Sequence, residues 1–402
     1  MRGRGRLRRG SRASQRTLQK LGNLLLVRVS GEVKNHAWGS KTLMQDHFGI
    51  GDGTEPVAEV WFGTHPGGES TAIASGKNLS ELVGSQLSFL AKFLAAASPL
   101  SIQVHPNSEH ARAGYEKEQA LGLSLDDASR NYRDAFHKPE ILIALSKFRA
   151  LCGFRPRTEI LEIFLAFSES QPRFGELAAM VATEVPLKEI VGCLLEDKGL
   201  AAGFAETFGG EGVLTPEQVF PIQARDLALE LLENYPGDTG ALVALVMNYV
   251  ELDPGQAIFL PAGNLHAYLS GLGVEVMASS DNVIRGGLTQ KHIDRAELMK
   301  ITDFAVLANP LVVPKKLAEG LVEYSVGAQE FRVYKADITG SNLLADLELP
   351  AAAMVLCVSG EVAVSTSLEE REVLKKADVV YMSGAKKFSL SGSGTAFVVL
   401  GA

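Results

Sequence analysis

Histidine is the side chain most suited to binding metals and moving protons near neutral pH, and here it is confined to one part of the chain. All eight histidines lie between His36 and His292. Within that region Gln103 and His105 stand two apart in a segment predicted to be a strand. Side chains two apart on a strand share a face and can converge on one ion. By itself, however, a Gln-x-His pair is more often a half-buried polar pair than a metal site.

A second histidine motif runs from Gly255 to His266. It consists of a glycine, five residues, Pro-x-Gly, two residues and histidine, an order that resembles the second motif of cupin barrels. A strand that stops at Pro261 and Gly263 would let the next strand begin with the His266 imidazole aimed into a barrel. For this motif alone, a hairpin with a surface histidine is the alternative.

A charged pair, Lys138 and Glu140, forms the third piece. Pro139 between them favours extended backbone in the preceding residue, and the apolar residues 141–145 follow. A Lys-x-Glu pair is ordinarily a solvated ion pair, yet unpaired charges beside a buried strand are costly. Coordination of Glu140 to a cation would remove that cost.

These pieces together supply nitrogen and oxygen ligands without a thiolate and with one formal negative charge, a set suited to zinc. The candidate ligands are Gln103, His105, Glu140 and His266. A metal held this way would keep net positive charge, which it needs in order to polarise a carbonyl or hydroxyl group. Iron or manganese, held by the two histidines and the carboxylate, is the main alternative metal.

Apolar periodicity predicts the elements that position these residues. The expected strands before the helical block are residues 24–29, 57–62, 100–104 and 141–145, and a helix is expected at 79–97. A helical period then fills residues 156–251, with segments at 159–167, 187–195, 224–234 and 240–250. Thr215 to Gln218 has the order of a capped helix start.

After residue 252 the chain returns to short strands separated by glycines, as at 353–358, 361–365 and 397–400. Repeated strands with glycine turns indicate a barrel or jelly roll.

Composition limits the class of protein. With 402 residues and 46% hydrophobic composition, the chain can form more than one domain. No apolar run reaches the roughly 18 residues of a membrane span. The three cysteines, Cys152, Cys193 and Cys357, lack paired spacing, which favours a reducing compartment and predicts a cytoplasmic protein.

The start of the chain differs from the rest. Residues 1–22 carry seven Arg and one Lys without an acid, although the whole chain has a net charge of −8. We interpret this segment as a disordered basic tail, in preference to a nucleic-acid arm or a secretory signal, because it has no apolar stretch. A transit peptide is the remaining alternative.

Four segments, taken in order, resemble signatures of type I mannose-6-phosphate isomerases. They are residues 33–40, 100–106, 132–140 and 263–291. The resemblance covers essentially the whole chain after the basic tail. One departure is Phe136, which stands where the family usually has asparagine; it removes no candidate ligand.

The resemblance implies a mainly β fold with an α-helical insertion. It places a cupin-like jelly-roll catalytic domain at residues 23–155 and 252–317, a helical insertion domain at 156–251, and a second, C-terminal jelly roll at 318–402. It also implies one zinc ion (Zn2+) per chain on the four candidate ligands and an essential arginine at Arg285.

The implied reaction is the zinc-dependent interconversion of mannose 6-phosphate and fructose 6-phosphate through an enediolate. The metal would act as a Lewis acid, and Arg285 would add fixed positive charge. The proton carrier stays open among His137, Lys138, Glu275, Asp281 and a metal-bound water. We favour Lys138 with Asp281, since burial and the metal can lower the pKa of a lysine.

Three further residues are assigned to substrate or phosphate contacts: Lys92, Ser101 and Lys291. For Lys92, a surface lysine that covers apolar side chains is an equal alternative. The expected partner is a small phosphosugar, with no nucleic acid and no membrane, and the expected state is a monomer. Two rival functions are an iron-dependent cupin oxygenase and a non-catalytic sugar-phosphate sensor.

Overall fold

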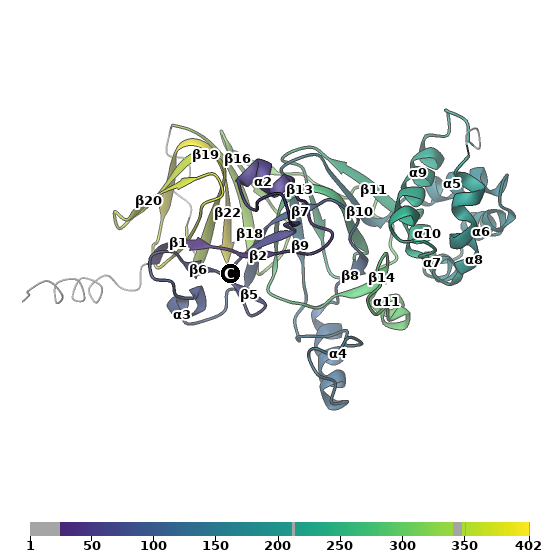
Figure 1. Cartoon of the computed structure of the whole chain (residues 1–402), viewed down its shortest axis with the longest axis horizontal. Helices are drawn as coiled ribbons and strands as arrows, with labels where there is room; N and C mark the ends of the chain where they lie inside the picture. The colour runs from purple at the N-terminus through teal and green to yellow at the C-terminus, as the bar shows by residue number, and fades with distance from the viewer. Residues whose placement is uncertain (1–24, 211–213, 341–347, 350, 402) are drawn as a thin grey trace, which may run out of the picture. The chain divides into compact units, whose positions relative to one another are not determined.

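The computed structural model describes residues 25–210, 214–340, 348–349 and 351–401 (Figure 1). The predicted basic tail at residues 1–22 lies outside these ranges. The described residues gather into two compact units. One unit takes in residues up to 32, 62–88 and those from 314 onward, and the other takes in 33–61 and 89–313. The domain boundaries given above stay a prediction.

The unit that contains the C-terminal strands is built on one antiparallel sheet. Its strands follow the order β16-β17-β18-β22-β19-β21-β1-β6, and β20 pairs with β19. The bounds are β1 Leu25–Ser30, β6 Thr71–Ala72, β16 Lys315–Ala318, β17 Leu321–Tyr324, β18 Phe331–Thr339, β19 Ala352–Thr366, β20 Arg371–Lys375, β21 Val379–Ser383 and β22 Phe388–Gly401. The early strand β1 therefore pairs with β21, far along the sequence. A small hairpin, β4 (Thr64–His65) with β5 (Gly68–Glu69), and helix α3 (Leu79–Val83) complete this unit.

The two strands expected at 353–358 and 361–365 are one continuous strand, β19. The pairing of β19 with β22 shifts register between Cys357 and Ser359. Gly360 follows with a φ of 69°, and a Cβ there would lie 2.1 Å from the Ser393 carbonyl oxygen. Only glycine fits this bulge, because both the positive φ and the close backbone approach exclude a side chain.

The other unit holds a second, mostly antiparallel sheet in the order β15-β12-β9-β13-β7-β3-β2, while β8, β10, β11 and β14 join it through β13 and one another. The bounds are β2 Glu32–Lys34, β3 Glu59–Phe62, β7 Phe89–Ala96, β8 Ile102–Val104, β9 Glu140–Ala144, β10 Phe148–Phe154, β11 Met247–Leu252, β12 Ala257–Leu260, β13 His266–Ala278, β14 Ile284–Gly287 and β15 Leu311–Val312. With these strands the architecture is mainly β, as predicted.

Strand β13 links the two faces of this unit. Its first half pairs with β10 and its second half with β7 and β9. The change of partner falls at Gly271, whose φ is 126° and where a Cβ would lie 2.6 Å from the Lys147 carbonyl oxygen. A glycine at this corner lets one strand serve both faces, as strands do when they change sheets in β-sandwiches.

The helices of the same unit lie mostly between β10 and β11 in sequence. The bounds are α2 Leu43–Phe48, α4 Ser108–Ala120, α5 Arg157–Ser168, α6 Pro172–Ala182, α7 Leu187–Glu196, α8 Lys198–Phe208, α9 Val219–Asn234, α10 Gly240–Ala244 and α11 Arg295–Ile301. Figure 1 shows α5 to α10 gathered in one block beside β10 and β11. In the described residues, no helix combines the length and the apolar character needed to cross a membrane.

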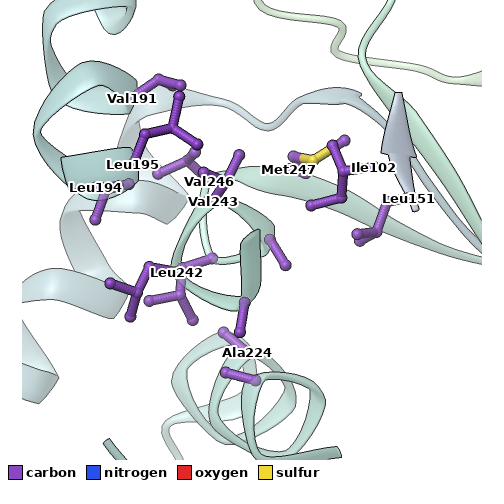
Figure 2. Close-up of a cluster of buried hydrophobic side chains, with 14 of the residues drawn as sticks. Ile102, Leu151, Val191, Leu194, Leu195, Ala224, Leu242, Val243, Val246 and Met247 are labelled. Atoms are coloured by element: carbon purple, nitrogen blue, oxygen red, sulfur yellow. The ribbon is translucent and has the colours of Figure 1, made fainter. Parts of the chain in front are cut away.

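One hydrophobic core runs from the helical block into the strands. Val243 and Val246 pack near Met247, and this group continues to Leu151 on β10 and Ile102 on β8 (Figure 2). All five side chains are at most 1% exposed. The helical block is therefore packed against the strands and does not form an isolated core.

Three predicted elements differ from the structure. The helix expected at 79–97 is correct only for α3, which ends at Val83; residues 89–96 form β7, in which every residue is buried. A strand buried on both faces has no alternation, so its apolar run also fits a helix. Residues 240–250, expected to be one helical segment, divide into α10 and β11.

The predicted helix start at Thr215 is also displaced. The side chain of Gln218 accepts a hydrogen bond from the Thr215 amide at 2.7 Å, as a capping residue would. Helix α9 nevertheless begins at Val219. The four residues therefore form a turn ahead of the helix.

The aromatic cluster in the helical block predicts a large stability difference between two positions on α5. Phe167 is fully buried and its ring lies 4.7 Å from that of Phe208, whereas Leu165 is 53% exposed. We expect Phe167→Ala to lower the free energy of unfolding by about 3–5 kcal/mol, because it leaves a cavity. Leu165→Ala, the matched control, should change it by less than about 0.5 kcal/mol. Urea unfolding followed by circular dichroism measures both, and equal effects would contradict this packing.

Candidate metal centre and active site

Three ligand atoms from three strand ends meet in the interior of the unit that contains the helices. His105 follows β8, Glu140 begins β9 and His266 begins β13, and their ligand atoms all lie within 4.8 Å of one another. Glu140 Oε2 is 3.3 Å from His105 Nε2 and 3.5 Å from His266 Nε2. The three residues are at most 1% exposed. The predicted turn at Pro261 and Gly263 does deliver His266 into the interior.

The orientation of each imidazole is set by a backbone carbonyl. His105 Nδ1 lies 2.7 Å from the Asn282 carbonyl oxygen, and His266 Nδ1 lies 3.0 Å from that of Asn264. A carbonyl oxygen only accepts, so each Nδ1 must donate. In the neutral ring this leaves the Nε2 lone pair facing Glu140, the arrangement found in metal-bound histidines.

This cluster needs a cation. Burial lowers the pKa of His105 to about 4, although the carboxylate of Glu140 opposes the shift. Burial would raise the pKa of Glu140, but Lys138 and His105 hold it well below its usual range. The neutral imidazole and the carboxylate then face each other as two acceptors, and the described part of the chain offers no hydrogen-bond donor to His105 Nε2 or Glu140 Oε2. A bound metal ion would satisfy both.

Gln103 is placed to complete the ligand set. Gln103 on β8 lies in register with His266 on β13 and with Arg285 on β14. Its side-chain amide nitrogen is 3.3 Å from His266 Nε2. The amide oxygen and nitrogen of Gln103 have nearly the same shape. A rotation of the amide group by half a turn therefore brings Oε1 into the cluster in place of Nε2. The predicted pair on one strand is therefore brought together with the other two ligands.

Lys138 lies against the ligand Glu140. Its Nζ is 3.0 Å from Glu140 Oε1, and the residue is 8% exposed. The two charged side chains of this segment therefore form an ion pair with each other. The ion pair leaves the other oxygen of Glu140 to face the histidines.

Lys92 is held in a buried charge network. Its Nζ is 2.7 Å from Glu275 Oε2 and 3.0 Å from Glu59 Oε1, and it lies 5.0 Å from the centre of the Trp61 ring. Burial would lower the pKa of Lys92, but Glu275 and Glu59 together raise it above its usual value. This lysine stays protonated and is not a base.

Glu275 has the environment of a group that exchanges protons. Burial raises its pKa, the charges of Glu140 and Glu59 add to the rise, and Lys92 opposes it. The Tyr268 hydroxyl donates to Glu275 Oε1 at 2.9 Å. Carboxyl groups with raised pKa values near a metal cluster are typical of active sites.

Three cationic side chains, Arg133, Arg285 and Lys291, lie near one another, and here the neighbouring charges are positive. Burial and the nearby Arg133 lower the pKa of Arg285, while partial desolvation, Arg285 and Arg133 lower that of Lys291. None of the three side chains has a carboxylate within 4.0 Å among the described residues. Unpaired cations that repel one another form a natural site for an anion.

The remaining predicted residues lie around this centre. Ser101 immediately precedes β8, and His137 adjoins Lys138 in the loop before β9. The backbone amide of Asp281 donates to Asp134 at 2.8 Å. Phe136 is 63% exposed, and its carbonyl oxygen accepts from Asn282 at 2.8 Å. At residue 136 the loop is held through its backbone carbonyl. Phenylalanine in place of the family's usual asparagine therefore leaves the candidate ligands in place.

Sequence reasoning missed several residues of the site. Glu59 was detectable as an acid inside the apolar residues 57–62, and Tyr268 as the second residue after His266 on the same strand face. Arg133 lies inside a segment already singled out. Asn282 had no signal of its own, because its partners are distant in sequence.

Comparisons with known proteins agree with this geometry. Residues 26–157 match the model of the catalytic domain of type I phosphomannose isomerase. A mannose-6-phosphate isomerase of Salmonella typhimurium is 36% identical over 399 residues, covering 92% of this chain and 97% of that protein. The Homo sapiens protein of the same name is 32% identical over 376 residues, covering 84% of this chain and 86% of its own.

Solved structures give the same result. A crystal structure of mannose 6-phosphate isomerase bound with zinc and yttrium matches with a TM-score of 0.82 and 31% identity, covering 94% of this chain and 99% of that one. This match confirms the predicted fold class, a cupin-like catalytic part with a helical insertion and further C-terminal β structure. With matches along most of the chain in both sequence and structure, the protein belongs to the type I phosphomannose isomerase family.

Proposed function

We propose that this isomerase interconverts mannose 6-phosphate and fructose 6-phosphate through an enediolate, at one zinc ion per chain. The proposed ligands are Gln103, His105, Glu140 and His266. The observation that carries the proposal is the buried pair of acceptors, His105 Nε2 and Glu140 Oε2, which lie 3.3 Å apart and find no donor in the residues that the structure describes. The relatives named mannose-6-phosphate isomerase support the substrate.

Zinc suits these donors. Two imidazoles, one carboxylate and an amide oxygen form a nitrogen and oxygen set with an overall charge of −1. Cys152 lies opposite His266 in register, yet burial raises the pKa of its thiol to about 12, so it does not supply a thiolate. The zinc-bound structure of a mannose 6-phosphate isomerase also supports this metal.

The reaction moves a proton between C1 and C2 of the open sugar and places negative charge on oxygen. Zinc supplies Lewis-acid polarisation of the sugar oxygens when bound. Arg285 lies beside Gln103 in register, so its guanidinium supplies fixed positive charge near the developing oxyanion. Its charge has no carboxylate partner among the described residues and is free to act on the substrate.

We assign proton transfer to Lys138 with Asp281. Lys138 is anchored beside a metal ligand, which fixes the position of its ammonium group. His137, the residue before it, and Glu275, whose pKa is raised by burial, are the other groups able to exchange protons. Of these, Glu275 is already engaged with Tyr268 and Lys92.

The phosphate group of the substrate must be bound by positive charge, but it takes no part in the reaction itself. Lys291, with Arg285 and Arg133 nearby, offers positive charge that no carboxylate in the described part of the chain neutralises. Lys92 differs, because two glutamates share its charge. We therefore assign the phosphate to the cluster around Lys291, and Lys92 and Ser101 to contacts with the sugar.

The ligand assignment predicts loss of both metal and activity in His266→Ala. Removing one imidazole leaves too few donors, so zinc content should fall well below one ion per chain, and isomerase activity with it. His110→Ala on α4, outside the cluster, is the matched control and should keep both. Metal analysis with a coupled assay on mannose 6-phosphate measures the two quantities. Full zinc and full activity in His266→Ala would sink the assignment, and iron-dependent oxygen consumption by the wild-type protein in place of isomerisation would favour the oxygenase.

Arg285 is predicted to act on the transition state. Arg285→Ala should lower kcat and kcat/KM together by roughly 100-fold or more, because the enediolate gains charge that the ground-state sugar lacks. Arg285→Lys should rescue only part of the loss, since an ammonium lacks the planar fork of the guanidinium.

The exposed Arg295 on α11 supplies the control for this substitution. Arg295→Ala should leave both kinetic parameters near wild type. If Arg285→Ala raised KM while kcat stayed unchanged, Arg285 would serve substrate binding only, and absence of turnover in the wild-type protein would favour the sugar-phosphate sensor.

A further inference from the structure

One buried side chain ties the loop before the ligand Glu140 to the segment after β13. Asn282 is 0% exposed. Its Oδ1 accepts from the backbone amides of Arg133 at 2.8 Å and Asp134 at 3.3 Å. Its Nδ2 donates to the carbonyl oxygens of Asp134 at 2.9 Å and Phe136 at 2.8 Å.

These contacts use the whole hydrogen-bonding capacity of the amide. Nδ2 also lies 3.1 Å from Asp134 Oδ1, so its two hydrogens serve three acceptors. No other side chain of this shape both accepts from two backbone amides and donates to two carbonyls. An aspartate at the same place would set its carboxylate against those carbonyls and against Asp134.

The backbone of the same residue contacts the metal cluster. The Asn282 carbonyl oxygen accepts from His105 Nδ1 at 2.7 Å. Residue 282 therefore holds a ligand through its main chain and the loop at 133–136 through its side chain. That loop continues directly into His137 and Lys138.

We propose that Asn282 is a positioning residue for the isomerase reaction, acting through the loop at 133–136 to set the place of Lys138. The inference rests on the proposed function, which gives Lys138 its role in proton transfer. Asn282 itself does not touch the reacting atoms. Its side chain determines where the lysine stands, while its carbonyl determines the His105 tautomer.

Ser280 supports the same loop. Its hydroxyl contacts Asp134 Oδ1 at 2.8 Å and the Phe136 carbonyl oxygen at 3.2 Å. It also lies 3.3 Å from the Asn282 amide, from which it accepts. A substitution at Ser280 therefore weakens the clamp without removing it.

Asn282→Ala removes the side-chain amide of Asn282 but keeps its backbone carbonyl, so this variant tests the role of the side chain alone. We expect kcat to fall about 10- to 100-fold, the usual effect of losing a partner that orients active-site groups. The dissociation constant for zinc, measured by competition with a chelator, should change less than about tenfold. Unchanged kcat, or a zinc affinity lowered much further, would overturn the inference.

Asn248 provides a matched control in the same unit. Its Nδ2 donates to the carbonyl oxygens of Cys152 at 3.0 Å and Leu307 at 2.8 Å. Asn248→Ala should lower the melting temperature but keep kcat within about threefold of wild type. An equal fall of kcat in both variants would mean that Asn282 is merely structural.

A double-mutant cycle with Lys138→Ala separates positioning from general loosening. If Asn282 acts through Lys138, the loss caused by Asn282→Ala should shrink to less than about threefold when Lys138 is already alanine. Full additivity would contradict the inference. Wild-type kcat in Lys138→Ala alone would instead contradict the proposed function and, with it, any action through Lys138.

Should Asn282→Ala fail to fold, Ser280→Ala tests the same clamp more gently. We expect a fall in kcat of about three- to tenfold with zinc affinity kept, and the same loss of effect in the Lys138→Ala background. Wild-type kcat in Ser280→Ala would then count against the clamp.

Discussion

Two acceptors that face each other in the buried interior of one unit constrain the rest of the catalytic part of the structure. His105 Nε2 and Glu140 Oε2 lie 3.3 Å apart, with no donor for either among the described residues, and unsatisfied groups of this kind cost free energy unless a cation joins them. The surrounding strands and helices position these two groups. β8, β9 and β13 each deliver one ligand at a strand end, the corner at Gly271 lets β13 reach both faces, and the helical core packs behind Ile102 beside Gln103.

Two kinds of cationic side chain surround this centre, those paired with a buried carboxylate and those without such a partner among the described residues. Lys92 and Lys138 are each paired with a buried carboxylate, which fixes the position of their ammonium groups. Arg285 and Lys291 belong to the second kind and repel each other. That repulsion costs stability in the free protein, and a bound phosphosugar would relieve it.

The sequence allowed the clustering of His105, Glu140 and His266 to be predicted because each candidate ligand sits in a local pattern. Gln103 and His105 share a strand face, Glu140 opens an apolar strand, and His266 follows a Pro-x-Gly turn. What could not be predicted depends on distant pairing. β7 was taken as helix because a strand buried on both faces lacks alternation. The clamp at Asn282 and the pairing of β1 with β21 join residues far apart in sequence, where no local pattern exists.

The most direct test of the account is X-ray absorption spectroscopy at the zinc edge on the full-length protein purified with its metal. The account predicts one zinc per chain surrounded by nitrogen and oxygen at about 2.0–2.2 Å, with the outer-ring scattering of two imidazoles and no sulfur. A zinc–sulfur distance near roughly 2.3 Å would place a cysteine such as Cys152 in the site. That result, or a protein that binds no zinc, would contradict the account.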